Sequence, residues 1–312
     1  MASVLDEPYF KDEQAAFARL EEIVWPNGPV CPHCGCSGRI NALRGVKDKA
    51  GRERLGLKKC YDCRKQFTVR VGTVFEKSHV GLHLWFQAAF LLCSSKKGIS
   101  SNQLSRTLGV TPQTAWFIGH RIREAMRSGS LAPMGGPGQT VEVDETYVGR
   151  VPGIPKVWGS AKHKNVVLTL VERGGAARSF HVESAKIKDI APIIRANLAR
   201  ESTLMTDEGT QYIGLGREFA DHRTVDHERK EYGYTDRVTG FNANTNAIEG
   251  YFSIFKRGMK GVYQHCSEKH LHRYLAEFDF RYSYRARLGV GDAARMRTAL
   301  EGVSGKRLTY RN

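Results

Sequence analysis

The sequence has 312 residues, and its 41% hydrophobic and 26% charged residues are ordinary values for a soluble globular protein of one to three domains. The acidic N-terminus argues against a secretory signal peptide. The most apolar run, residues 84–93, is too short to span a bilayer, so no membrane partner is expected. The 48 Lys and Arg against 32 Asp and Glu give a net charge of +16, and residues 251–312 hold thirteen Lys and Arg against five Asp and Glu. This excess predicts a polyanionic partner, most simply nucleic acid, in preference to a basic surface that only maintains solubility.

Composition divides the chain into six segments. The division follows a Gly- and Cys-rich stretch, a helical stretch after it, and the linker composition of SGSLAPMGGPGQT. The segments are an N-terminal helix (1–25), a Cys-rich segment (26–78), a helical segment (79–128), a linker (129–139), a segment in which strands alternate with helices (140–288), and a basic C-terminal tail (289–312).

The Cys-rich segment contains two CxxC pairs, in CPHCGCSG and KKCYDCRKQFTVR. Two such turns supply four thiolates for one tetrahedral zinc ion, namely Cys31, Cys34, Cys60 and Cys63, with Cys36 as an alternative to Cys34. The odd total of seven cysteines argues against a disulfide framework. We therefore predict a zinc ribbon with a closed, structural zinc site, followed by a strand in FTVRVGTVF.

The helical segment contains two predicted helices joined by a glycine turn, in GISSNQLSRTLGVTPQTAWFIGHRIREAM, residues 98–126. Ser100 is expected to cap the first helix, Gly109 to end it, and Thr111 followed by Pro112 to begin the second. This arrangement predicts a helix-turn-helix DNA-binding segment, with an ordinary helical hairpin as the alternative. The polar residues of the second helix that would be available to DNA are Gln113, Thr114, His120, Arg121 and Arg123.

Three acidic residues are predicted on neighbouring elements of the segment 140–288. TVEVDETYVGR alternates as a strand does and carries Asp144 near its end, and STLMTDEGTQY reads as a strand that stops at Asp207. Two hairpin strands, NVVLTLVERGG and ARSFHVES, and the helix IKDIAPIIRANLA lie between them, and Glu249 follows on a later helix. Converging carboxylates are the hard oxygen ligands that two Mg²⁺ ions need, with coordination positions left for phosphate and water.

Glu249 has a second interpretation in NTNAIEGYFSIFKRG. Asn246 and Glu249 stand three residues apart before apolar residues at helical spacing, which is the pattern of a capping box. In the same helix we expect a buried stripe and, beside it, a polar face that begins with Glu249. The buried stripe is Ile248, Phe252, Phe255 and Met259, and the polar face is Glu249, Ser253, Lys256 and Lys260.

Together these motifs resemble the bacterial insertion-sequence transposases of the DDE class, in the subgroup with an N-terminal zinc ribbon. The resemblance is carried by CPHC…CYDCRKQFTVRVGTVFE, VEVDETYVG, TDEGTQY and NTNAIEGYFSIFKRGMKGVYQHCSEKHLHRYLAEFDFRY, from about Cys31 to Tyr284. It implies a multidomain α/β protein with a zinc ribbon, a helix-turn-helix segment and an RNase H-like mixed-sheet catalytic domain over residues 140–288. The basic loop RVPGIPKVWGSAKHK, residues 150–164, has no chemistry assigned to it.

The resemblance implies roles for single residues. Asp144 and Asp207 are the first two metal-binding acids and Glu249 is the third, with Lys256, seven residues later, contacting DNA at the cut end. Some relatives have Asn in place of the third acid, which keeps Asn246 as a competitor for that role.

The implied cofactors are two Mg²⁺ or Mn²⁺ ions in addition to the structural zinc. Water hydrolyses one strand at the element end, and the freed 3′-OH then attacks a target phosphodiester. The implied partners are double-stranded DNA, as element ends and target, and further copies of the chain in a dimer or larger assembly on DNA. A bacterial, cytoplasmic and nucleoid-associated location follows, and Lys256, Arg257 and Lys260 are the basic residues expected to face DNA.

Two other functions fit the same residues. A stand-alone metal-dependent nuclease needs the same acids but does not join DNA ends. A regulator derived from a transposase binds DNA without cutting it, and loss of one acid would favour that interpretation. All three acids are present in the sequence.

Overall fold

The computed structural model describes residues 3–129, 131–207, 209, 211–225 and 233–308. The chain forms two compact units. The first comprises Met1–Ser95, Ile99–Arg127 and Gly291–Asn312, and the second comprises Lys96–Gly98 and Ser128–Val290. No helix of the described residues is long and apolar enough to cross a membrane.

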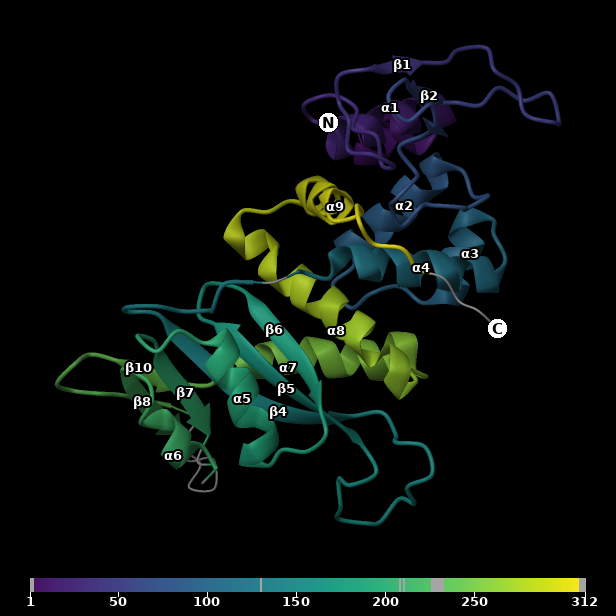
Figure 1. Cartoon of the computed structure of the whole chain (residues 1–312). Helices are drawn as coiled ribbons and strands as arrows, with labels where there is room; N and C mark the ends of the chain where they lie inside the picture. The colour runs from purple at the N-terminus through teal and green to yellow at the C-terminus, as the bar shows by residue number, and fades with distance from the viewer. Residues whose placement is uncertain (1–2, 130, 208, 210, 226–232, 309–312) are drawn as a thin grey trace. The chain divides into compact units, whose positions relative to one another are not determined.

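The first unit combines a small three-stranded antiparallel sheet, in the order β1-β2-β3, with a set of helices (Figure 1). Its elements are η1 (Val4–Asp6), η2 (Pro8–Phe10), α1 (Glu13–Val24), β1 (Ile40–Ala42), β2 (Lys58–Cys60), β3 (Gln66–Phe67), α2 (Leu82–Ser94), α3 (Ser101–Leu108), α4 (Pro112–Met126) and α9 (Asp292–Glu301).

The predicted start and stop residues of α3 and α4 are confirmed. The Ser100 side chain accepts a hydrogen bond from the Gln103 amide, and the Thr111 side chain accepts one from the Thr114 amide. Gly109 ends α3 with φ of 67°, a left-handed conformation that glycine adopts without steric cost. The apolar stripe of α4, including Ile118 and Ile122, is buried as its helical spacing predicts.

Two predicted segments differ from the structure. The strand expected in FTVRVGTVF ends at Phe67, and the residues after it form turns. The expected basic tail contains α9, which packs against α2 in the first unit. Buried Arg295 there donates to the Cys93 carbonyl, 2.8 Å away. Basic residues of this segment therefore donate hydrogen bonds to backbone carbonyls as well as adding positive charge. Residues 309–312 of the predicted tail lie outside the described residues.

The second unit is built around a five-stranded mixed sheet in the order β6-β5-β4-β7-β8. Strands β4, β5 and β6 are antiparallel, and β4, β7 and β8 are parallel. A separate two-stranded hairpin joins β9 to β10. The strands are β4 (Thr140–Val148), β5 (Asn165–Glu172), β6 (Ala177–Val182), β7 (Thr203–Asp207), β8 (Asp221–Val225), β9 (Gly233–Thr235) and β10 (Asn242–Asn244).

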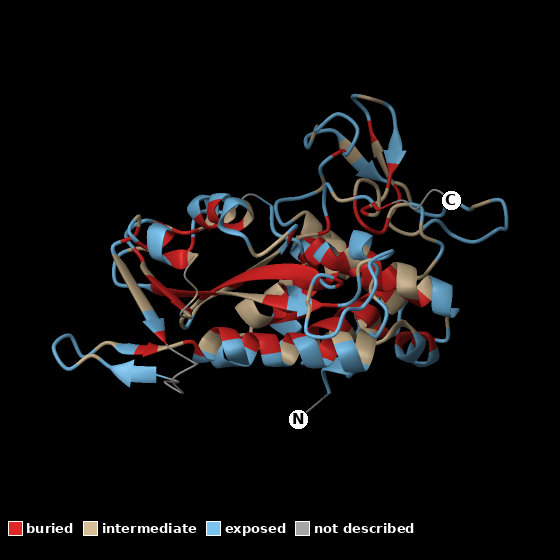
Figure 2. Cartoon of the chain, turned by 90° about the horizontal axis from the view of Figure 1, so that it is seen from below, coloured by how far each residue is buried: buried red, intermediate tan, exposed pale blue. Residues whose placement is uncertain are grey.

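Helices cover both faces of this sheet. Residues of α5 and α6 share one hydrophobic core with β4, β5 and β7, and residues of α7 and α8 share a second core with the other face. In Figure 1, α5 lies in front of the strands, and in Figure 2 the central strands are buried. The helices are α5 (Ile187–Asn197), α6 (Tyr212–Gly216), α7 (Asn246–Gly258), the π-helical turn η3 (Met259–Tyr263), α8 (Glu268–Ser283) and the short η4 (Ala286–Leu288).

Successive side chains of β4 point to opposite faces of the sheet, so each residue's position in the strand determines which helices it faces. Val141 and Val143 belong to the core beside α5, whereas Val148 belongs to the core beside α7. Asp144 has the parity of Val148 and therefore faces α7. It lies in the middle of β4 and not near its end as expected, because the strand continues to Val148 and pairs with β5 along its whole length.

Candidate active site and metal centre

The four predicted zinc ligands converge in the ribbon. All four Sγ atoms of Cys31, Cys34, Cys60 and Cys63 lie within 4.8 Å of one another. The Sγ atoms of Cys31 and Cys63 are 3.6 Å apart, and those of Cys34 and Cys60 are 3.7 Å apart. Tetrahedral zinc with bonds of about 2.3 Å requires sulfur atoms about 3.8 Å apart, so the quartet fits a structural zinc ion.

Cys36 belongs to a different group. Its ligand atom gathers with those of Cys60 and Asp62. The complete four-thiol set therefore uses Cys34, as the spacing of the first CxxC pair indicates.

The helix α4 exposes fewer of its polar residues than expected. Gln113 and Thr114 are at its N-terminal end and are at least partly exposed. Arg121 is only 4% exposed, and its guanidinium donates to the carbonyls of Val74, Glu76 and Leu308.

His120 and Arg123 are also buried, with exposures of 0% and 2%. The expectation that Arg121, Arg123 and His120 face DNA therefore does not fit the structure. The buried side chains stabilise the first unit, and Gln113 and Thr114 are left as the polar residues at the accessible end of α4.

Asp144 and Asp207 are held on adjacent parallel strands. Thr140 to Glu142 of β4 pair with Thr203 to Met205 of β7, so two further residues bring Asp144 level with Asp207. Both side chains have the parity that faces α7. Asp207 Oδ1 accepts a hydrogen bond from the Gly209 amide at 3.1 Å, and Asp144 Oδ1 accepts one from the Glu145 amide at 2.6 Å.

The charge of Asp207 acts on Asp144. Burial, together with the charge of Asp207, raises the pKa of Asp144 to about 7, although the Lys256 ammonium lowers it. A carboxyl pair with this coupling is stabilised by a cation between the two charges. The pair is consequently suited to bind a divalent metal ion, although metal binding by these residues is a proposal developed below.

Glu249 and Asn246 lie at the exposed N-terminal end of α7. Thr245, not Asn246, occupies the N-cap position, and its side chain makes no capping hydrogen bond. Glu249 Oε1 accepts a hydrogen bond from the Thr245 hydroxyl at 2.8 Å. The capping box expected between Asn246 and Glu249 is therefore wrong, because the helix begins at Asn246, one residue earlier than that pattern requires.

The predicted stripe and polar face are present apart from the last member of the stripe. Ile248, Phe252 and Phe255 are buried, whereas Met259 lies in η3 and is half-buried. Ser253, Lys256, Arg257 and Lys260 are exposed. In the described part of the chain, groups of three or more ligand atoms within 4.8 Å occur only in the ribbon. Glu249 thus stands on the polar face of α7 without forming such a tight group with Asp144 and Asp207.

A buried ion pair fixes the start of α7 against the sheet. Glu142, two residues before Asp144, is completely buried and accepts from Arg173 Nε at 2.7 Å and from the Ile248 amide at 2.8 Å. Arg173 also donates to the carbonyls of Asn242 and Asn244. This Glu142–Arg173 clamp connects β4, the β5–β6 hairpin and the residues that lead into α7, and it sets the place of the Glu249 helix.

The sequence interpretation missed two further groups beside the acid pair. Burial, together with the charge of Asp207, raises the pKa of Glu145 to about 7, although a hydrogen bond from Tyr212 lowers it. Tyr212 is fully buried beside this carboxyl. The alternation of β4 contained a signal, because Glu145 continues the core-facing series of Val141 and Val143, where an apolar residue is expected.

Comparisons with known proteins agree with this arrangement. Residues 135–283 match the family described as the ISXO2-like transposase domain, and residues 11–66 match the transposase zinc-ribbon domain. The chain belongs to the insertion-sequence transposases. The transposase is also 28% identical over 287 residues to a protein in the transposable element ISH50 of Halobacterium salinarum, and this match covers 87% of the chain and 91% of the relative.

The matched domains coincide with the two sites. The zinc-ribbon match includes all four ligands of the thiol quartet, and the second match includes Asp144, Asp207 and Glu249. The predicted family and the structural zinc site are thereby confirmed.

Proposed function

We propose that this transposase cuts DNA at the ends of its element and joins the freed 3′-OH to target DNA. The observation that carries the proposal is the Asp144–Asp207 pair, held level on two parallel strands, half-buried, and coupled to the charge of Lys256. Membership of the transposase family supports the reaction class.

The residues around the pair fit divalent cations. Asp144 and Asp207 are the two acids that hold them, and Glu249 on α7 is the third, with Asn246 as its competitor. Bound Mg²⁺ or Mn²⁺ polarises the phosphodiester and lowers the pKa of water.

The chain's own residues perform the other tasks. The exposed Lys256, Arg257 and Lys260 lie along α7 and η3 after Glu249 and attract the phosphate backbone of the cut end. The Glu142–Arg173 clamp holds α7 so that Glu249 and Lys256 keep their positions relative to β4.

The fold supports a finer classification of both units. We assign the second unit to the RNase H-like catalytic folds, and the strand order β6-β5-β4-β7-β8 with three antiparallel and three parallel strands sharing β4 supports this assignment. We assign α3 and α4 to a helix-turn-helix, supported by the Gly109 turn and by Gln113 and Thr114 at the start of α4. The partners are double-stranded element ends and target DNA, and a dimer or larger assembly brings two ends together.

The test is incubation of the full chain with labelled element-end DNA, a target plasmid and Mg²⁺. Joined products are expected from the wild type. Asp144→Asn and Asp207→Asn are expected to lose cleavage by roughly a thousandfold or more, because loss of a metal ligand gives up several kcal/mol of transition-state stabilisation.

Glu183→Gln is the matched control, because Glu183 is an exposed acid of the same unit outside the site. Full cleavage by either Asp variant would reject this active site. Nicking without joining would identify a nuclease, and binding without cleavage would identify a regulator.

A further inference from the structure

The basic loop between β4 and β5 contains a second candidate binding site. Residues 150–164 leave the sheet after Val148 and return at Asn165, which pairs with Val148 in the last rung of the ladder. The loop carries Arg150, Lys156, Lys162 and Lys164, all exposed, and no acidic residue. The loop, which directly follows the strand that carries Asp144, therefore attracts polyanions.

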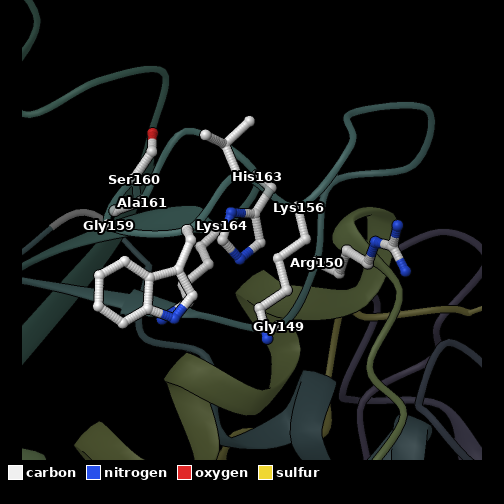
Figure 3. Close-up of a pocket in the computed structure, with 10 residues that line it drawn as sticks. Gly149, Arg150, Lys156, Gly159, Ser160, Ala161, His163 and Lys164 are labelled. Atoms are coloured by element: carbon white, nitrogen blue, oxygen red, sulfur yellow. The ribbon is translucent and has the colours of Figure 1, made fainter.

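The loop lines an open cavity of about 580 Å³. Its lining includes Lys156, Trp158, Ser160, His163 and Lys164. Figure 3 shows Lys156 and Lys164 on either side of the His163 ring, with Arg150 directed away from it. A cavity of this size falls within the range that small ligands occupy in proteins, roughly 300–1,000 Å³.

His163 is the group in this cavity that points to a ligand. It is only 7% exposed, and its Nδ1 has no hydrogen-bond partner among the described residues. Its carbonyl accepts from the Val151 amide at 2.8 Å, which fixes the backbone that carries the ring. A buried imidazole nitrogen without a partner is costly, and the cost is removed when a polar ligand fills the cavity.

Trp158 lies in the same lining and is 95% exposed. An indole this exposed in a basic loop suits the stacking of a nucleic-acid base, with neighbouring cations on the phosphates. Stacking on a side chain requires a base whose face is free, and a base inside a duplex is covered on both faces by its neighbours. The ligand chemistry that fits is therefore an unpaired nucleotide.

A second cavity connects this loop with the basic residues of α7 and η3. It has a volume of about 340 Å³, shares Gly149 and Lys164 with the first cavity, and is also lined by Lys256 and Lys260 of the polar face of α7 and η3. The charge of Lys256 acts on Asp144. Lys256 thus lines the same cavity as Lys164 of the loop and also acts on Asp144.

We propose that the loop 150–164 binds an unpaired nucleotide of the DNA strand that is cut at Asp144. The base stacks on Trp158, His163 and Ser160 hydrogen-bond to it, and Lys156 and Lys164 hold the adjacent phosphates. The inference rests on the proposed function, since that function defines the strand to which the nucleotide belongs.

The experiment measures binding by the full chain carrying Asp144→Asn, so that the DNA stays intact. The probes are a blunt duplex and the same duplex with a single-stranded tail that contains 2-aminopurine, whose fluorescence falls on stacking. The tail is expected to bind more tightly than the blunt end, with quenching. Trp158→Ala is expected to reduce this tail preference by roughly 5- to 150-fold and to abolish quenching, whereas Trp158→Phe retains most of both.

Val238→Ala is the matched control, because Val238 is also 95% exposed and lies in the β9–β10 hairpin of the same unit. Lys156→Ala is expected to weaken the binding of tailed and blunt DNA alike. The dependence of the binding constant on salt concentration should fall by the equivalent of about one phosphate contact. Circular dichroism confirms that each variant folds. An unchanged tail preference and unchanged quenching in Trp158→Ala would overturn the inference, as would the absence of any tail preference before substitution.

Cleavage by the chain with Asp144 restored is measured in parallel. If it cleaves while Trp158→Ala changes nothing in the binding assay, the inference fails and the proposed function stands. If it does not cleave but the tail preference depends on Trp158, the proposed function fails and the nucleotide site of the loop stands.

Discussion

The thiol quartet of the ribbon and the acid pair of the mixed sheet use ligand side chains in opposite ways. The four thiols come from two short turns, and their Sγ atoms already lie within 4.8 Å of one another. The acids come from β4, β7 and α7, and the charge of Asp207 raises the pKa of Asp144. Short-range chain geometry assembles the first site, whereas the second depends on strand pairing, helix packing and charge.

This difference has a functional meaning. A closed four-thiol site leaves no coordination position for substrate and contributes to folding. A half-buried pair of acids with an exposed third acid on a neighbouring helix keeps space for phosphate and water. The predictions below test whether the two sites separate into a folding site and a reaction site.

The largest effect is expected from the ribbon. Cys60→Ser should reduce zinc below about half an equivalent and unfold the ribbon, because structural zinc sites contribute roughly 10 kcal/mol or more to folding. The ribbon's own core is small, with Cys31, Cys60 and Phe67 as its buried members. Metal analysis and circular dichroism measure the change.

Cys36→Ser is the control inside the same ribbon, since Cys36 is outside the quartet, and it should keep a full equivalent of zinc. Loss of zinc in Cys36→Ser with retention in Cys34→Ser would show that Cys36 is the ligand.

The clamp beneath the acid pair should give the next largest effect. Arg173→Met leaves the fully buried Glu142 without its charge partner and should destabilise the second unit by about 3 kcal/mol. Thermal unfolding measures this change. Arg195→Met is the comparison, because it breaks the more exposed Arg195–Glu218 pair on the surface of the same unit and should leave the melting temperature nearly unchanged. Equal shifts in the two variants would contradict a special role for the clamp.

A smaller effect distinguishes the two candidates for the third ligand. Glu249→Gln should slow single-turnover cleavage by roughly a hundredfold, because a neutral amide is a weaker ligand for Mg²⁺ than a carboxylate. Asn246→Ala should slow it by less than about tenfold on the same scale. The reverse order would assign the third position to Asn246.

The last prediction concerns the pH dependence of stability. The folded-state pKa values of Asp144 and Glu145, about 7, lie above their ordinary values of 3.8 and 4.5, so the folded chain holds protons that the unfolded chain has released. Their contribution to stability is complete below about pH 4 and is lost as the pH rises to 7, by at most about 1.4 kcal/mol per pH unit for each proton.

The melting temperature of the second unit, measured without added divalent cations, should therefore be higher at pH 5 than at pH 8. The double variant Asp144→Asn, Glu145→Gln should show a flatter pH profile. A wild-type profile that rises between these two pH values would contradict the assigned shifts.

The same contrast explains what could be predicted from the sequence. The CxxC spacing, the caps at Ser100 and Thr111, and the hairpin of β5 and β6 depend on neighbouring residues, and the structure confirms them. The polar face of α7 also follows from spacing within one helix.

The remaining features depend on partners distant in sequence. Arg121 is buried because carbonyls of Val74 and Leu308 accept its hydrogen bonds, and no local pattern shows this. Likewise, the ion pair of Glu142 and Arg173 joins β4 to the turn that follows its neighbour β5. The length of β4 beyond Asp144 also depends on its pairing with β5. Strands β8, β9 and β10 are short, and only β8 joins the main sheet, which is why periodicity did not reveal them.

The continuation of β4 past Asp144 has a consequence for how such proteins diversify. Four more residues of strand, ending at the Val148–Asn165 pair, separate Asp144 from the loop that follows. Because this pair holds both loop ends together, a loop of different length or composition can be grafted between them without shifting the register of Asp144. If the proposed roles of the loop and the acids hold, a chimera that carries a relative's loop should cut with the same acids while preferring that relative's DNA.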